Sequence, residues 1–118
     1  MLVKRHDRSP ALGAWTTGGK YHCRIKAYQS SFHMNCYVTD TLKDGYGVYL
    51  QAKGVLNYGF DTSSFRFTEN VSPGYPVTDH FRGTVDVATT GIDAWRIRVC
   101  RDIRHRADPC GRYSEVDV

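Results

Sequence analysis

Glutamate is scarce in this chain of 118 residues, which contains only two, Glu69 and Glu115. Helices are usually rich in alanine, leucine, glutamate and lysine, whereas strands favour aromatic and β-branched residues. The chain instead contains eleven glycines, eight tyrosines, five phenylalanines and two tryptophans. This composition is unusual for a helical protein and indicates a structure built from strands.

Long apolar runs are also missing, because no uninterrupted apolar stretch exceeds a few residues. A membrane-spanning helix needs about 20 such residues, so the sequence excludes one. Heptad repeats are absent and 41% of the residues are hydrophobic, which excludes a coiled coil, collagen and wholesale disorder. The length fits one compact domain, and the formal net charge of +4 makes it basic.

Four cysteines are present, and none of them has the C-x-x-C or C-x-x-H spacing of a structural zinc site. We therefore predict neither a metal nor a cofactor. An even number of cysteines in a small chain rich in glycine and tyrosine favours disulfides in an oxidising compartment. The alternative is four free thiols in a cytosolic protein. The cysteines therefore lead us to expect a secreted protein. Residues 1–7 contain no apolar signal segment, which is weak evidence against export, and we expect the signal peptide to be absent from this sequence.

Apolar and polar residues alternate along most of the chain after residue 19, as they do in half-buried strands. Turn residues interrupt this alternation every 8–12 residues, which is typical of an antiparallel sandwich or small barrel. We predict an all-β fold: a small antiparallel β-sandwich, or a partly closed barrel, of six to seven strands with two disulfides. The predicted strands are 20–27, 32–39, 48–53, 55–60, 64–68, 77–87 with a bulge at Gly83, and 95–100.

The positions of the cysteines suggest two bonds. Cys23 and Cys36 both fall on the apolar side of the first two predicted strands, where a cross-strand bond is geometrically sensible. Cys100 falls on the outward side of the last predicted strand, out of register with the core, and is free to bond Cys110 across the loop 101–109. Four cysteines still allow three pairings, and the sequence alone does not choose among them.

The chain divides into two parts. Residues 1–19 combine a broken pattern with several glycines, which predicts a flexible basic N-terminal segment carrying Lys4, Arg5 and Arg8. Residues 20–118 form the predicted sandwich domain. The three cations of the first part are candidate binding residues.

A second basic group lies near the C-terminus, where five arginines fall within eleven residues and only Asp102 opposes them. We predict that they bind a partner, because arginine clusters suit carboxylates, phosphates or an acidic protein. Stacking aromatics, which nucleic-acid binding usually adds, are sparse beside them, so a protein partner is favoured. The alternative is a charged edge strand that discourages aggregation. The five are Arg96, Arg98, Arg101, Arg104 and Arg106.

Catalytic motifs are absent, since the chain contains neither G-x-S-x-G nor H-E-x-x-H. We therefore predict that it is not an enzyme. The best enzymatic alternative is a small basic ribonuclease, which needs a carboxylate, a histidine and an arginine around the scissile phosphate. Those residue types are supplied by Glu69, His80 and Arg82, or by His33 or His105 with Glu115.

Two segments resemble known proteins. Residues 36–49 read C-Y-V-T-D-T-L-K-D-G-Y-G-V-Y and residues 95–102 read W-R-I-R-V-C-R-D, and both are similar to small secreted two-disulfide proteins of actinobacteria. The resemblance covers about residues 20–112 and extends to the adaptor subunit of the umbrella toxin particles of Streptomyces. In those particles a β-sandwich with a flexible N-terminal segment joins a lectin-bearing subunit to a large repeat-containing toxin.

The resemblance implies that residues 1–19 add as an extended strand to one partner. It also implies that the face bearing Arg96 and Arg98 contacts a second partner. Together with the missing catalytic motifs, it leads us to expect a non-catalytic protein-binding or adaptor module of an exported complex, whose partners are proteins of the secreted fraction and not a membrane. The alternatives are a ribonuclease-type toxin and a secreted protease inhibitor that presents the loop 101–109.

Overall fold

The computed structural model describes residues 3–6, 18–57, 59–71 and 77–118, and of residues 3–6 only the backbone. In these ranges it contains no helix, and thus none long and apolar enough to cross a membrane. The strands are β1 (Val3–His6), β2 (Gly19–Ala27), β3 (Ser31–Asp40), β4 (Val48–Leu56), β5 (Phe65–Arg66), β6 (Val77–Asp86), β7 (Ile92–Arg101) and β8 (Ser114–Asp117).

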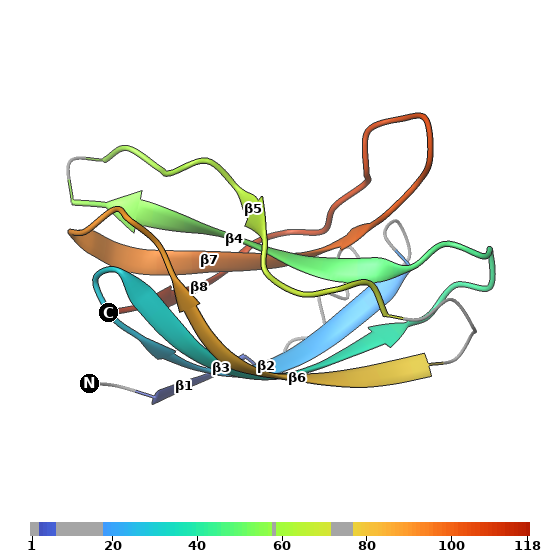
Figure 1. Cartoon of the computed structure of the whole chain (residues 1–118), viewed down its shortest axis with the longest axis horizontal. Coiled ribbons are helices and arrows are strands. Elements are labelled where there is room, and N and C mark those ends of the chain that lie inside the picture. Colours follow the sequence, from blue (N-terminus) through green and yellow to red (C-terminus); the bar gives the residue numbers. More distant parts are fainter. Residues whose placement is uncertain (1–2, 7–17, 58, 72–76) are drawn as a thin grey trace.

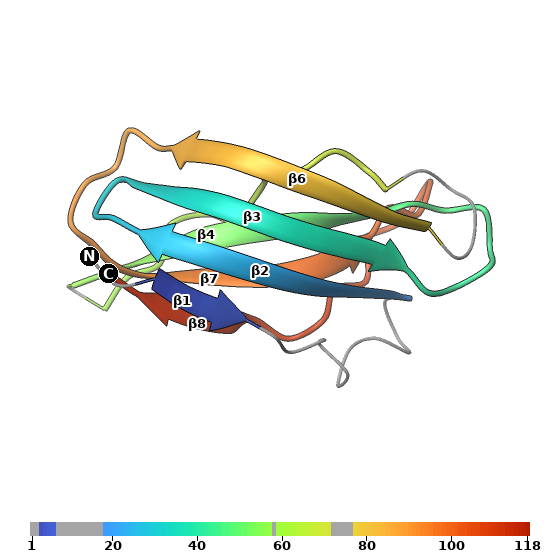
Figure 2. The ribbon, with the colours of Figure 1, turned by 90° about the horizontal axis from the view of Figure 1, so that it is seen from below.

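These strands form two antiparallel sheets that lie over each other as two layers (Figure 1). Sheet A has the order β1-β2-β3-β6, and sheet B has the order β5-β4-β7-β8. Over the described residues each sheet keeps its own hydrogen-bonded ladder, so the fold is the predicted β-sandwich and not a closed barrel. Figure 2 looks onto sheet A and shows β3 lying between β2 and β6.

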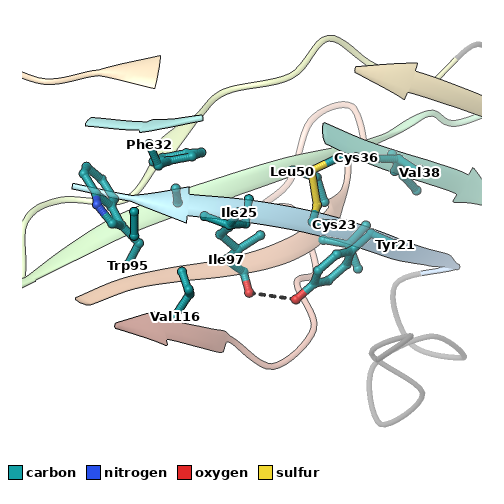
Figure 3. Packing of buried hydrophobic residues seen from close by; sticks show 14 of the residues in the cluster. Tyr21, Cys23, Ile25, Phe32, Cys36, Val38, Leu50, Trp95, Ile97 and Val116 are labelled. Carbon is teal, nitrogen blue, oxygen red and sulfur yellow. Dashed lines mark hydrogen bonds between the residues drawn. A yellow bond between two sulfur atoms is a disulfide. The ribbon is translucent and has the colours of Figure 1, made fainter. Parts of the chain in front are cut away.

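The core between the sheets follows from the period of two in the sequence. Along β2 every odd residue from Gly19 to Ala27 is buried and every even one is exposed. Trp95 of sheet B packs against Phe32 of sheet A with ring centroids 4.9 Å apart (Figure 3). The Tyr21 hydroxyl donates a hydrogen bond across the core to the carbonyl of Ile97, at 3.1 Å. Apolar contact and this bond together join the two layers.

Both predicted disulfides are present. Cys23 and Cys36 are directly opposite each other on β2 and β3. Cys100 on β7 is bonded to Cys110, which closes the intervening loop. The prediction that Cys100 faces outward is wrong, because Cys100 is fully buried. Two disulfides are compatible with an extracellular protein, because thiols are kept reduced in the cytosol.

Three of the sequence-based strand predictions are wrong. The expected strand 55–60 does not exist, because Val55 and Leu56 end β4 after a register shift and the chain then turns back, with the Leu56 amide bonded to the Phe60 carbonyl at 2.8 Å. No bulge occurs at Gly83, which pairs with Met34 in an unbroken register. The short strand β8 has no counterpart in the prediction. One predicted strand is absent and one observed strand was not predicted, so the number of strands between residues 19 and 118 is still seven.

The predicted flexible N-terminal segment is partly a strand. Val3–His6 forms β1, which pairs antiparallel with residues 23–26 of β2 and so extends sheet A. Lys4 and Arg5 are in this strand. Residues 1–2 and 7–17, with Arg8, lie outside the described part of the chain, so the flexibility of the segment stays a prediction.

Arg101 is not in an exposed loop, as the sequence suggested, but is the last residue of β7 and only 1% exposed. Its Nη2 group donates to Asp40 Oδ1 and to the Gly18 carbonyl, both at 2.6 Å. Its Nη1 group donates to Asp44 Oδ1 at 2.6 Å and to the Tyr46 carbonyl at 2.7 Å. The Asp40–Asp44 turn is therefore organised by this guanidinium group.

These contacts join the start of β2, the end of β3 and the connection to β4 to the end of β7. Gly18 has a φ of 70°, a conformation that favours glycine. A Cβ atom at Gly18 would also overlap the Arg101 guanidinium group. The backbone can therefore approach the buried charge closely only because this residue has no side chain.

We expect the substitution Arg101→Ala to lower the free energy of unfolding by about 3–5 kcal/mol, because it leaves the buried Asp40 carboxylate without its partner. The control is Arg104→Ala, which removes an exposed arginine of the adjacent loop and should change stability by no more than about 0.5 kcal/mol. Urea denaturation of the oxidised proteins measures both. A loss below about 1 kcal/mol for Arg101→Ala would contradict the structural role of the buried cation.

Candidate functional site

The outer face of sheet B carries the first two predicted arginines, Arg96 and Arg98, and both are held by neighbours. Arg96 Nε donates to Glu115 Oε1 at 2.8 Å, and its Nη1 group is 3.5 Å from Asp61. The Glu115 hydrogen bond raises the pKa of Arg96 further. Arg98 donates to Gln51 Oε1 at 2.8 and 3.0 Å and lies 4.4 Å from the centre of the Tyr113 ring.

Other charges of sheet B are paired in the same way. Lys53 is 2.9 Å from Asp61, and its hydrogen bond holds the pKa of that carboxyl below the ordinary value. Arg66 lies over the Tyr49 ring and contacts Asp102 at 3.3 Å. Hydrogen bonds from Asn70 and then Arg66 lower the pKa of Asp102. This face therefore neutralises its own charge.

The remaining predicted arginines lie elsewhere. Arg101 is buried, so it is not available to a partner. Arg104 and Arg106 are exposed in the loop 102–109, which bends away from the sheet (Figure 1). Asp108 ties this loop down, since it accepts hydrogen bonds from the Ile103 amide at 3.0 Å and the Tyr49 hydroxyl at 2.6 Å. The five arginines thus do not form one surface.

The outer face of sheet A has a different character. Register places twelve outward residues of β2, β3 and β6 in four rows of three, one residue from each strand, and the next row along β3 and β6 is Ser31 with the exposed Asp86. None of the twelve is acidic, four are lysine or arginine and three are histidine. We call this surface the cationic face: Lys20, Thr39 and Thr78; His22, Tyr37 and His80; Arg24, Asn35 and Arg82; Lys26, His33 and Thr84.

Contacts between β3 and β6 order the centre of the cationic face. Tyr37 is 49% exposed and its ring stacks on that of His80, with centroids 4.3 Å apart and planes 7° from parallel. His80 Nε2 is also hydrogen-bonded to Asn35 Oδ1. In the next row His33 Nδ1 is 2.6 Å from the Thr84 hydroxyl oxygen.

The lysine and arginine side chains of this face form no ion pair with a carboxylate in the described part of the chain. These side chains are Lys20, Lys26, Arg24 and Arg82. Unpaired cations attract anions, and their long side chains do so best where no carboxylate competes. The face can therefore bind an anionic group or an acidic surface.

The ribonuclease candidates are not brought together. His80 and Arg82 are on the cationic face, whereas Glu69 follows β5 of the other sheet. The second set, His33 or His105 with Glu115, is not brought together either. His33 is hydrogen-bonded to Thr84 and His105 is in the loop 102–109, whereas Glu115 is paired with Arg96 in sheet B. Within the described ranges no three His, Cys, Asp or Glu side chains are grouped so that they could hold a metal ion.

Sequence reasoning missed the cationic face as a site. A signal was available in 20–27, where every even residue is lysine, histidine or arginine. That alternation identifies the outward residues of one strand only. Which strands lie beside it depends on pairing between distant segments, such as the pairing that places β3 between β2 and β6. The alternation in 32–39 places Tyr37 on the polar side of its strand, but its neighbours Arg24 and Arg82 come from those other strands.

No protein-family model matches this chain, and no curated protein or solved structure matches it either. The resemblance to actinobacterial secreted proteins and to the toxin adaptor therefore stays a prediction. The case for function rests on the geometry described above.

Burial, and then the hydrogen bond to Asp108, raises the pKa of Tyr49 above the ordinary value of 10.0. The folded protein thus holds this proton more tightly than the unfolded chain does. The phenol stabilises the fold fully below about pH 10, and this contribution is lost as the pH rises through the folded-state pKa.

We expect alkaline titration followed by tyrosinate absorbance to show a late transition that disappears in Tyr49→Phe. Asp108→Asn should move this transition to lower pH, because it removes the charge that disfavours the phenolate. A late transition that survives Tyr49→Phe would assign it to another tyrosine.

Proposed function

We propose that this chain is a non-catalytic protein-binding module of an exported complex, and that it binds an acidic partner protein through the cationic face. The observation that carries the proposal is the absence of any carboxylate among its twelve described residues, beside four permanent cations. The surface is a sheet face, so its side chains are held in register by the ladder beneath them.

Several properties of the face suit a protein partner. Tyrosine and arginine are among the residues most enriched at the energetic centres of protein interfaces, and the face presents Tyr37 in the row next to the one that contains both Arg24 and Arg82. Complementary charge accelerates encounter and fixes the orientation of two proteins. An acidic partner would meet a cation from each of the strands β2 and β6.

The charges of sheet B support the same choice by contrast. Arg96, Lys53 and Arg66 are each bonded to a carboxylate of this chain, so a partner would have to displace these pairs before it could use them. A partner that binds the lysine and arginine side chains of the cationic face has no such ion pairs of described residues to displace. We therefore assign the main interface to sheet A rather than to the C-terminal arginines.

An adaptor needs a second contact. In the proposed arrangement, the N-terminal segment with Lys4, Arg5 and Arg8 supplies it, as the resemblance to the toxin adaptor implies. Residues 3–6 are extended in β1, which is the conformation that strand addition needs, and they would exchange their pairing with β2 for pairing with the partner.

We expect the double substitution Arg24→Glu and Arg82→Glu to weaken binding of an acidic secreted partner at least about tenfold, because it places two repulsive charges at the centre of the face. The matched control is Arg104→Glu with Arg106→Glu, which changes the net charge equally but on the exposed loop. Capture from the secreted proteins of the producing organism, followed by titration of the purified partner at low and high salt, measures the effect.

Equal binding by the face variant and the wild type would overturn the proposed interface. Loss of binding in the loop variant alone would move the interface to the loop 102–109. Incubation with labelled RNA tests the enzymatic alternative: we expect no cleavage, and cleavage that His80→Ala abolishes would replace the binding module by a ribonuclease.

A further inference from the structure

We infer that the cationic face contains a discrete subsite for a tetrahedral oxyanion, a phosphate or sulfate group. The subsite is a hollow of about 330 Å³ between β2 and β3, lined by His22, Arg24, Asn35 and Tyr37. The inference deepens the proposed function, because it specifies an anion that the partner would carry.

The first argument is the arrangement of the four side chains. His22 is directly opposite Tyr37, and Arg24 is directly opposite Asn35 in the next row. The Cβ atoms of two directly opposite residues in a sheet are about 5 Å apart. Successive residues on the same face of one strand are about 7 Å apart. The polar ends of Arg24, Asn35 and Tyr37 around a space of this size can reach one tetrahedral group from several sides.

The second argument is the orientation of the Asn35 amide. Its oxygen accepts a hydrogen bond from His80 Nε2, which therefore carries the hydrogen. Its NH2 group is then the part that Asn35 offers to the hollow. His80 in turn is held by its stacking on Tyr37, so the amide is fixed before any ligand arrives.

The third argument is the chemistry of the lining. The guanidinium of Arg24, the amide of Asn35 and the phenol of Tyr37 are donors, and none of the described lining residues is a carboxylate. A guanidinium group donates in a fork that matches two oxygens of a phosphate or sulfate. A carboxylate has only two oxygens, so it would leave part of this donor set unused.

The test is titration of the oxidised full chain with inorganic phosphate, sulfate, acetate and chloride, followed by NMR of backbone and side-chain amides. We expect saturable shifts centred on the Asn35 side chain and the Arg24 Nε–H group with phosphate and sulfate, and weaker binding of acetate. Phosphoserine, compared with inorganic phosphate, then distinguishes an anion carried on a partner from a free one.

Two substitutions assign the subsite. Asn35→Asp keeps an oxygen acceptor for His80 but replaces the NH2 donor by a negative charge, and Arg24→Gln removes the fork. Each should weaken phosphate binding at least about tenfold. The matched control for the second is Arg106→Gln, which removes the same charge from the loop 102–109 and should leave binding within about twofold.

Non-saturable shifts spread over all surface cations, or equal affinity for acetate and phosphate, would overturn the subsite. The two proposals fail separately. If phosphate does not bind but charge reversal of Arg24 and Arg82 still abolishes partner binding, only the subsite is wrong. If phosphate binds as expected and the same charge reversal leaves partner binding unchanged, only the proposed interface is wrong.

Discussion

The buried guanidinium group of Arg101 is the interaction on which one end of this sandwich depends. A charge taken out of water is costly unless it is paired and its donors are satisfied. Here two carboxylates and two carbonyls from three other segments surround it. The cation therefore holds the β3–β4 connection and Gly18, which precedes β2, next to the end of β7. In this way it fixes how the two sheets meet at this end of the sandwich.

The two outer faces of the sandwich use the same residue types for different purposes. Sheet B pairs its lysine and arginine side chains with its own carboxylates and tyrosine rings, which gives a self-contained surface. Sheet A places lysine, arginine and histidine in adjoining rows without a carboxylate among them. Repulsion among these like charges lowers the stability of the fold. Proteins accept a local loss of stability of this kind mainly at functional sites. This asymmetry is the physical basis for placing the interface on sheet A.

The sequence predicted what depends on local pattern and missed what depends on distant pairing. Alternation identified β2, β3 and β7, and it also brought Cys23 opposite Cys36. It did not reveal β8, a strand of four residues with a short pattern, or that β4 continues to Leu56 before the backbone turns at Gly59. Arg101 was misplaced because an arginine at a strand end is usually exposed. Its burial is explained only by the acidic residues that the fold brings around it.

The disulfide between Cys23 and Cys36 lies under the cationic face, between the row of His22 and Tyr37 and the row of Arg24 and Asn35. The covalent bond thus constrains the two strands from which the oxyanion hollow is built. Thiols stay reduced in the cytosol and form disulfides in oxidising surroundings. This constraint consequently depends on the redox environment: a chain with reduced thiols lacks it, and β2 and β3 are joined covalently only where the surroundings oxidise the two cysteines.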